Sequence, residues 1–373
     1  MLSDLPVLVF TSPSGTSQAE AWMAEGRQAA AIDLVRRLSS VAGLGPIFAL
    51  AGRNEDQSAI AEAGADILDA DPGPFHFGQT LSSWVDRLGL ASFGYFGGAS
   101  APLVQIELLR TCLERLRQGG PAARAVVNNL HSTDWGFFQN AGAIHKLADR
   151  LPSDNSLGWV LEREGGVAVA SLPASAETRA DLDTPSDFLL VEGHEGLGDH
   201  LRAFMAGAPA GARQRVRQLE QIVRTPASSL TLIGRTSSHV WAELERRRLI
   251  WIRVFAEERG MVASGRLAAG HVQSLLALAM EAWGPRGLLE RLSRMSDAVL
   301  WDTRVWMATG SWPSEEDRFA GDLGWVESVS DPKLRELVDA CEAASVPVIC
   351  GGHGVVGGSL YAFLERIGPS PGL

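Results

Sequence analysis

The chain has 373 residues, of which 46% are hydrophobic and 21% are charged, a composition typical of folded globular proteins and not of disordered or fibrous ones. Its length suits two domains or one large domain. The 44 acidic residues outnumber the 33 basic ones, and the net charge of −11 disfavours nucleic acid as a partner, because most of such a surface would repel a phosphate backbone.

In the N-terminal half, short apolar segments alternate with longer amphipathic ones. We predict strands at 6–11, 46–51, 65–68, 92–96 and 124–127, and helices at 28–41, 79–88 and 105–117. This alternation predicts an α/β fold with a doubly wound, mainly parallel sheet covered on both faces. Ligands bind such sheets beyond the carboxyl ends of the strands. We therefore look for chemistry in the loops after Phe10, Ala51, Phe96 and Val127.

The small-residue segment AGAPAGA at 206–212 is the expected domain boundary, which gives domains at 1–205 and 213–373. The second domain has predicted strands at 230–233, 249–255 and 346–350, and predicted helices at 213–224, 271–283, 286–295 and from Ser359 onward. This pattern predicts a smaller, helix-rich α/β domain.

The rare residue types also limit the chemistry. The only lysines are Lys146 and Lys333, and arginine can clamp a phosphate but cannot act as a titrating base. Three cysteines, Cys112, Cys341 and Cys350, are too few and too scattered to predict a disulfide framework or a zinc site, which suits a reducing compartment. The first ten residues lack the basic segment of a signal peptide, and no apolar run reaches the ~18 residues of a membrane span. We expect a cytoplasmic protein without a membrane partner, and the sequence leaves a homo-oligomer open.

The phrase DLDTPSD at 181–187 is the most specific in the sequence. Asp181, Asp183 and Asp187 are three carboxylates within seven residues, a density that suits a hard divalent cation. The same phrase also fits the start of a helix, with Thr184 or Asp183 as N-cap and Pro185 at the first helical position. Both interpretations stay open on spacing alone.

This phrase resembles the D-[IV]-DTP-x-D motif that ends the nucleotide-binding domain of the MobA-like, GT-A-type nucleotidyltransferases, which include molybdenum cofactor nucleotidyltransferases and phospholactate guanylyltransferases. Other features agree in order. The opening strand is followed by a Ser/Gly loop at 11–17, the segment GRQAAAIDLVRRL at 26–38 is similar to the family's G-[RK]-P-L-L helix, and a strand precedes the segment APL at 101–103. The resemblance covers residues ~5 to 195 and none of the second domain.

The resemblance implies a nucleotide partner and transfer of a nucleotidyl group to a phosphate or alcohol acceptor, assisted by Mg²⁺. On this basis Asp134 and Asp183 would share the cation, with Asp181 beside them, and Arg27 would lie near the phosphates. The residues expected to contact the nucleotide are Ser12, Ser14, Gly15 and Ser100. Trp135 either stacks on the base or lies in the core.

Two departures from the family pattern divide the function hypotheses. Ser100 stands where the family usually carries a Mg²⁺-binding aspartate, and the first loop has no lysine. Both groups would stabilise charge during phosphoryl transfer. The alternative is a catalytically inactive domain used for binding or dimerisation, with the function in the second domain.

That second domain has a glycine-rich loop between a predicted strand and a predicted helix. Backbone amides of such a loop can face an anion at the helix N-terminus. The expected phosphate contacts are Gly351, Gly352, His353, Gly354, Gly357 and Gly358, joined by Arg235 if both loops lie at one sheet edge. The alternative is that these glycines allow tight packing where the strand turns into the helix.

Overall fold

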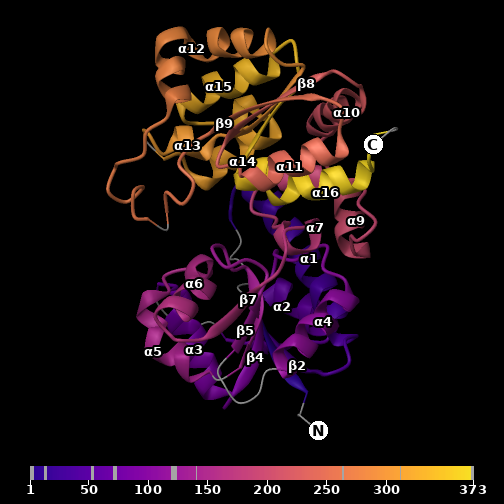
Figure 1. The fold of residues 1–373 in the computed structure, drawn as a ribbon, viewed down its shortest axis with the longest axis vertical. Helices are drawn as coiled ribbons and strands as arrows, with labels where there is room; N and C mark the ends of the chain where they lie inside the picture. Colours follow the sequence, from indigo (N-terminus) through magenta and orange to yellow (C-terminus); the bar gives the residue numbers. More distant parts are fainter. Residues whose placement is uncertain are drawn as a thin grey trace. The chain divides into compact units, whose positions relative to one another are not determined.

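A computed structural model describes residues 4–11, 15–51, 54–69, 74–118, 124–139, 141–262, 264–310 and 312–370 (Figure 1). The chain divides into two compact units. The first comprises Met1–Ser14, Arg27–Arg179 and Gly198–Leu201, and the second comprises Gly15–Gly26, Ala180–Leu197 and Arg202–Leu373. Three segments of the predicted first domain, 15–26, 180–197 and 202–205, therefore group with the second unit.

The first unit contains a seven-stranded sheet in the order β3-β2-β1-β4-β6-β5-β7. The strands are β1 (Leu5–Phe10), β2 (Leu44–Leu50), β3 (Asp66–Leu68), β4 (Ser92–Gly97), β5 (Arg124–Val127), β6 (Trp135–Gln139) and β7 (Ala168–Ser171). Only β6 runs antiparallel to its neighbours among these strands.

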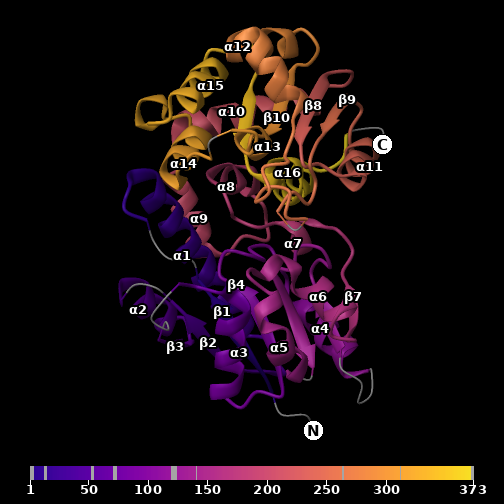
Figure 2. The same ribbon diagram turned by 90° about the vertical axis from the view of Figure 1, so that its left-hand side faces the viewer.

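Helices cover both faces of this sheet, as Figure 2 shows from the side. One face packs against α1 (Gln18–Ser39), α2 (Asn54–Glu62) and α4 (Ile106–Arg117). The other packs against α3 (Phe77–Arg87), α5 (Gly142–Leu147) and α6 (Leu157–Arg163). Side chains alternate along β1, so that Val7 and Val9 enter the first layer and Leu8 and Phe10 the second. A strand buried on both faces reads as a continuous apolar run.

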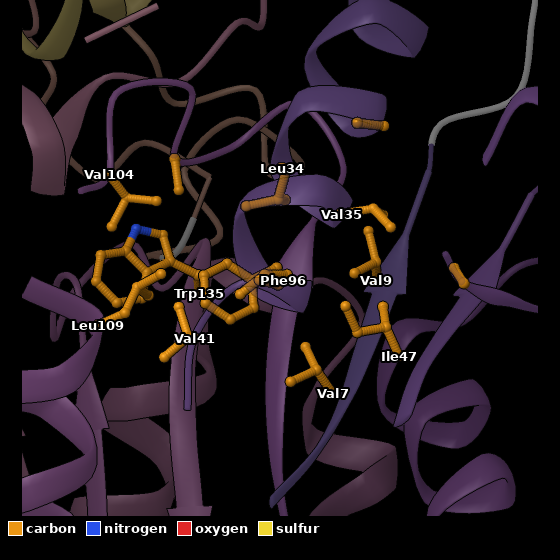
Figure 3. Close-up of a cluster of buried hydrophobic side chains, with 14 of the residues drawn as sticks. Val7, Val9, Leu34, Val35, Val41, Ile47, Phe96, Val104, Leu109 and Trp135 are labelled. Atoms are coloured by element: carbon orange, nitrogen blue, oxygen red, sulfur yellow. The ribbon is translucent and has the colours of Figure 1, made fainter. Parts of the chain in front are cut away.

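Trp135 lies at the centre of the first layer (Figure 3). Its ring is stacked on that of Phe96, with centroids 5.4 Å apart and planes 5° from parallel, and the residue is only 1% exposed. Trp135 is therefore a core residue, and the prediction that it stacks on a nucleotide base is wrong because the indole has no open face.

The second unit contains a four-stranded parallel sheet in the order β11-β10-β8-β9. Its strands are β8 (Ser229–Gly234), β9 (Trp251–Ala256), β10 (Ala298–Asp302) and β11 (Val348–Gly351). Its helices include α8 (Pro185–Val191), α10 (Ala210–Arg224), α11 (Ser238–Arg247), α12 (Leu275–Ser293), α14 (Glu315–Leu323), α15 (Pro332–Glu342) and α16 (Gly358–Ile367), and α9 (Asp199–Ala206) belongs to both units. Helices α12 and α15 pack on one face of this sheet, and α12 kinks at Gly284, whose φ is 68°.

The predicted fold class is confirmed: a mainly parallel, doubly wound α/β sheet and a second, smaller α/β sheet with more helix. Three strands escaped prediction, namely β6, β7 and β10. Within the described part of the chain, no helix combines the length and apolar character that a membrane crossing requires.

Trp135 is the best test of the first unit's core. Replacing it with alanine (W135A) removes the stacking partner of Phe96 and leaves a cavity between the sheet and its helix layer. We expect the free energy of unfolding of this unit to fall by about 3 to 5 kcal/mol, measured by urea denaturation. Trp159→Ala is the control, because Trp159 is 39% exposed; an equal loss in both variants would contradict the central position of Trp135.

Candidate functional site

The strand order of the first unit reverses between β1 and β4. Strands β2 and β3 continue the sheet on one side of β1, while β4 pairs with its other side. The helices that follow them, α1 after β1 and α4 after β4, pack on the same face of the sheet. Ligands of open α/β sheets bind beyond the carboxyl ends of the strands. Because β6 is antiparallel, its first residue pairs with the end of β4, so Trp135 lies opposite Phe96. Asp134, just before β6, is thus brought to the same edge.

Asp134 is held in place by Asn128, the first residue after β5. The Asn128 Nδ2 donates to Asp134 Oδ2 at 2.8 Å, and Asn128 Oδ1 accepts from the backbone N of Asp134 at 3.0 Å. Asn128 is 1% exposed, whereas Asp134 is half-buried. A fully buried amide therefore orients a carboxylate that still reaches solvent. This is the arrangement expected of a preorganised binding group.

The loop after β4 packs tightly onto this edge. The Gly98 amide donates to Phe10 O at 2.7 Å, and a Cβ at Gly98 would come within 2.8 Å of Thr11 Cγ2. Ser100 Oγ donates to Gly97 O at 2.7 Å and lies 3.0 Å from Asp134 O. Ser100 is 4% exposed, and its hydroxyl stabilises the loop through the bond to Gly97 O. Its role as a nucleotide contact stays a prediction.

Arg179 is a charged residue at this edge that the sequence analysis missed. Its guanidinium donates to the carbonyls of Leu172 at 2.9 Å, of Thr178 at 3.1 Å and of Asn128. These bonds tie the ends of β5 and β7 together beside Asn128. Arg27 lies instead within helix α1, and its predicted role near the phosphates stays a prediction.

Asp134 is a half-buried carboxylate among the described residues at the carboxyl edge of the first unit. No group of three or more His, Cys, Asp or Glu that could hold a metal occurs among the described residues. Mg²⁺ in nucleotide sites is commonly bound by one or two carboxylates together with substrate phosphates. The predicted role of Asp134 as a Mg²⁺ ligand stays a prediction.

The phrase at 181–187 belongs to the second unit. Thr184 has an extended backbone (φ −135°, ψ 158°) and precedes Pro185, the first residue of α8. The carboxylate of Asp187 accepts hydrogen bonds from the Thr184 backbone N and from Thr184 Oγ1, both at 2.8 Å. The interpretation of the phrase as a helix start is thus confirmed.

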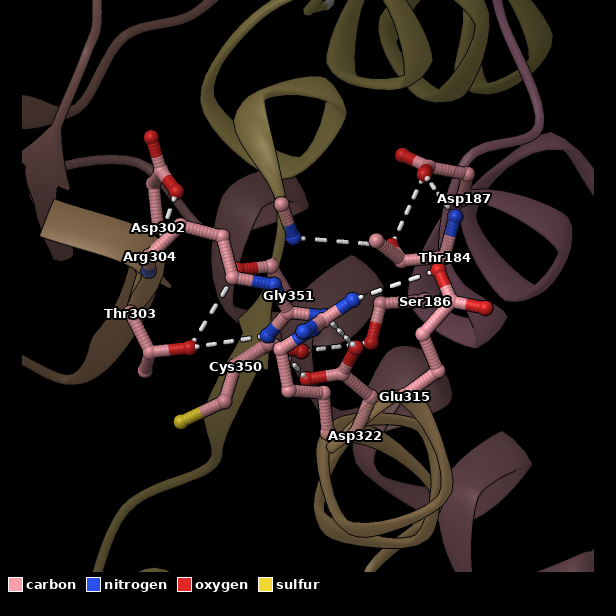
Figure 4. Close-up of polar contacts among 12 residues, drawn as sticks. Thr184, Ser186, Asp187, Asp302, Thr303, Arg304, Glu315, Asp322, Cys350 and Gly351 are labelled. Atoms are coloured by element: carbon pink, nitrogen blue, oxygen red, sulfur yellow. Dashed lines mark hydrogen bonds and ion pairs between the residues drawn. The ribbon is translucent and has the colours of Figure 1, made fainter. Parts of the chain in front are cut away.

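Figure 4 shows the bonds of Asp187 to Thr184. Asp187 also joins α8 to the glycine-rich loop and α16. Ser359 Oγ donates to Asp187 Oδ1 at 2.8 Å, and a Cβ at Gly354 would come within 1.9 Å of the same oxygen. Asp187 is fully buried, and burial together with the nearby charge of Asp183 raises its pKa to about 7, although the hydrogen bonds from Thr184 and Ser359 oppose the shift.

The four predicted metal and catalytic residues do not share a unit. Asp134 and Arg27 belong to the first unit, and Asp181 and Asp183 belong to the second. Asp183 is exposed at the start of α8. A cation shared by Asp134 and Asp183 stays a prediction. Ser12 and Ser14 lie outside the described residues, and Gly15 belongs to the second unit, where a Cβ would meet the side chain of Glu20 at 2.2 Å.

The second unit has its own crevice position, because its strand order reverses between β8 and β10. Arg235 follows β8, and Asp302 ends β10. Their side chains form a two-pronged ion pair, with Nε to Oδ2 at 2.6 Å and Nη2 to Oδ1 at 3.1 Å. Burial alone would raise the pKa of the fully buried Asp302, but the charge and hydrogen bonds of Arg235 hold it below its ordinary value. No hydrogen bond of Arg235 Nη1 is found among the described residues, and the side chain is 21% exposed.

A second buried ion pair lies beside the first. Arg304 Nη1 and Nη2 bind the carboxylate of Asp322 at 3.0 and 2.5 Å, and both side chains are almost completely buried (Figure 4). Between the two pairs, the Thr303 backbone N donates to Gly351 O at 3.1 Å. Buried charges are costly unless they are paired, and they concentrate at functional sites. The sequence alone did not predict this pair, because Arg304 and Asp322 are 18 positions apart.

The glycines of the 351–359 loop have a packing explanation. A Cβ would come within 2.5 Å of Val355 at Gly351, 2.8 Å of Thr184 at Gly352 and 2.9 Å of the His353 carbonyl at Gly357. The segment His353–Val356 forms a 3₁₀ turn, and α16 begins at Gly358. The loop is therefore a closely packed corner, and its use as a phosphate cradle stays a prediction.

Comparison with known proteins gives remote likenesses only. No protein-family model and no curated protein matches the chain. Among solved structures, CMP:2-keto-3-deoxy-manno-octonic acid synthetase complexed with CTP is similar at 13% identity and a TM-score of 0.37, over 54% of this chain and 98% of that one. A cytidylyltransferase from Leptospira borgpetersenii serovar Hardjo-bovis (strain JB197) is similar at 12% identity and a TM-score of 0.39, over 55% of this chain and 92% of that one.

The buried carboxyl group of Asp187 predicts a pH dependence of stability. Its pKa is about 7 in the folded unit against an ordinary 3.8, so the folded state retains this proton when the unfolded state has lost it. The contribution of Asp187 to stability is therefore most favourable below pH ~4 and declines until pH ~7, by on the order of 4 kcal/mol. Asp187→Asn keeps the shape and removes the titration. We expect the variant to match the parent at pH 4 and to exceed its melting temperature at pH 8.

Asp331→Asn is the matched control. Asp331 also caps a helix, accepting from Leu334 N at 2.8 Å at the start of α15, and asparagine caps helices equally well. This variant should keep the parental pH profile. If the melting temperatures of the parent and of Asp187→Asn change equally between pH 4 and pH 8, ionisation of Asp187 does not destabilise the fold and the prediction is wrong.

Proposed function

We propose that the first unit binds a nucleotide at the carboxyl edge of its sheet and that the chain is a nucleotide-dependent transferase. The observation that carries the proposal is Asp134, a half-exposed carboxylate that the buried Asn128 holds at the point where the strand order reverses. A mainly parallel sheet has its ligand crevice there. The resemblance of the sequence to MobA-like nucleotidyltransferases supports nucleotidyl transfer to a phosphate or alcohol acceptor as the reaction.

In this proposal Asp134 contacts a divalent cation that the nucleotide phosphates bring. The close packing of Gly98 on Thr11 fixes the loop after β4 against the end of β1. The residues contribute position and charge, with no covalent intermediate. The alternative is an inactive first unit that only binds or dimerises, with the function in the second unit. It rests on Ser100, whose hydroxyl donates to a carbonyl of its own loop, and on the absence of a lysine from the first loop.

A second candidate function belongs to the second unit, which would bind a phosphorylated small molecule. The observation that favours it is Arg235, whose guanidinium is fixed on one side by Asp302 and reaches solvent on the other. An arginine oriented in this way can offer its outer N–H groups to a phosphate in a fixed geometry. His353 is exposed in the loop after β11, at the same edge of the sheet.

The nucleotide proposal is tested by calorimetric titration of nucleoside triphosphates with and without Mg²⁺. We expect Asp134→Asn to weaken Mg²⁺-dependent binding by about ten-fold or more, which corresponds to at least ~1.4 kcal/mol. Asp86→Asn is the control, because Asp86 is an exposed carboxylate within α3. Asp183→Asn tests the predicted role of Asp183 separately, because Asp183 belongs to the second unit. If nucleotide affinity changes neither on removal of Mg²⁺ nor in Asp134→Asn, the proposal is wrong.

The second candidate is tested with inorganic phosphate and a simple phosphate monoester. Arg235→Gln leaves the carboxylate of Asp302 buried without its partner, so we expect a loss of about 3 kcal/mol in stability as well as lost phosphate binding. The double variant Arg235→Gln/Asp302→Asn removes both charges and should regain most of the stability but no phosphate binding. Recovery of both would show that Arg235 acts only through packing.

A further inference from the structure

Two of the three cysteines meet in the second unit. Cys341 is the tenth residue of helix α15, and Cys350 is the third residue of strand β11. Their Sγ atoms are 3.6 Å apart, which is the contact distance of two thiols. The eight residues between them contain the turn from helix to strand. Spacing alone did not predict this contact.

Both thiols are held by the core of the unit. Cys341, Leu337 and Val348 belong to one buried cluster, and Cys350 packs against it. Val348 and Cys350 are two residues apart on a strand, so their side chains leave the same face of the sheet, the face that α15 covers. The contact therefore follows from how the helix packs on the sheet.

The two thiols differ in access to solvent. Cys341 is 7% exposed, whereas Cys350 is intermediate in burial. An oxidant that approaches from solvent meets Cys350 first. Cys341 lies directly behind it, where a resolving thiol must lie.

We propose that Cys341 and Cys350 are a reversible thiol–disulfide site that takes low-molecular-weight disulfides as its oxidant. The Cys350 thiolate attacks one sulfur of a disulfide such as oxidised glutathione, forms a mixed disulfide and releases one glutathione thiolate. Cys341 then loses its proton and attacks the sulfur of Cys350, which releases the second glutathione. The protein loses two hydrogens and two electrons, and the oxidant is reduced to two thiols.

The second step is expected to be slow at neutral pH. The contact with the Cys350 thiol and the burial of Cys341 both raise the pKa of Cys341, so little of it is thiolate. Closure of the disulfide should therefore accelerate as the pH rises. Disulfides in reducing compartments are commonly transient and redox-sensing, which fits a slow and reversible pair.

The proposed disulfide would be placed at the base of the polar edge of this unit. Ser186 Oγ donates to the Cys350 carbonyl at 2.5 Å, and the next residue, Gly351, accepts from Thr303 N at 3.1 Å. A covalent bond from Cys350 to α15 would fix the root of the glycine-rich loop. Oxidation would thereby act on the loop that adjoins Arg235 and Asp302.

Cys112 supplies an internal control. It is fully buried in the core of the first unit, and its burial raises its pKa to about 12. The other two cysteines belong to the second unit. Cys112 should stay reduced under conditions that oxidise the pair.

The test is equilibration of the folded full-length chain with oxidised and reduced glutathione at pH 8, followed by alkylation and mass spectrometry. We expect a product that has lost two hydrogens and takes up alkylating agent only at Cys112. Cleavage after glutamate separates the cysteines at Glu342, so the disulfide appears as residues 337–342 linked to residues 343–365. Dithiothreitol should reverse it.

Two further measurements make the outcome decisive. Cys341→Ser should stop the reaction at a stable mixed disulfide on Cys350, and Cys350→Ser should leave Cys341 largely unmodified. The folded chain should form the 341–350 disulfide at an effective concentration about ten-fold above that of the chain unfolded in urea. The proposal is overturned if both thiols stay reduced in the folded chain, or if folding gives no advantage over the unfolded chain.

Discussion

The parallel arrangement of strands is the constraint on which both candidate sites depend. A parallel strand carries its chain to the same edge of the sheet as its neighbour, so the residues that follow each strand collect along one line. In each unit the order of strands also reverses once, between β1 and β4 and between β8 and β10. Residues that are distant in sequence meet along these edges. Asn128 and Arg179 meet where β5 and β7 end in the first unit, and Arg235 and Asp302 meet at the reversal in the second.

The single antiparallel strand changes which residues reach the edge of the first sheet. Strand β6 begins where β4 ends, so the residue before it, Asp134, arrives at the carboxyl edge from the amino end of its own strand. Its neighbour Trp135 is stacked on Phe96 in the core, and this contact fixes the start of β6. Asp134 directly precedes a strand whose position is fixed by packing, and its own position is therefore more precise than that of a carboxylate on a loop.

The second unit depends on a buried carboxyl group in a comparable way. Asp187 accepts bonds from the first turn of α8 and from Ser359 in α16, with Gly354 pressed against it. A phrase that resembles a nucleotide-binding motif thus has a complete structural explanation inside this unit. This limits what the resemblance can say of function, because Asp187 is fully occupied and only Asp183 of the phrase is exposed.

Much of the architecture could be predicted from sequence because buried parallel strands read as apolar runs between helices, and β1, β2, β4, β5 and β8 were found in this way. Strands β6 and β10 were missed for different reasons. The sequence WGFFQ of β6 has only five residues and directly follows a polar loop, so it does not stand out as a strand. The sequence AVLWD of β10 is also only five residues long and ends in an aspartate, although all five residues are buried. The missed residues Asn128 and Arg179 could have been suspected only once the strand order was known, since their significance comes from neighbours about 50 positions away.

The contact of Cys341 with Cys350 and the ion pair of Arg235 with Asp302 show why the remainder needed coordinates. Spacing on one helix or one strand reports which residues share a face, but not which helix covers that face. Helix α15 returns to β11 through a short turn, so a pair of scattered cysteines becomes a thiol contact. Likewise β8 and β10 are neighbours only because the sheet order reverses between them, and that reversal turns two isolated charges into a buried pair. In both cases the order of strands and the packing of helices bring the two side chains into contact, which the residue types alone do not predict.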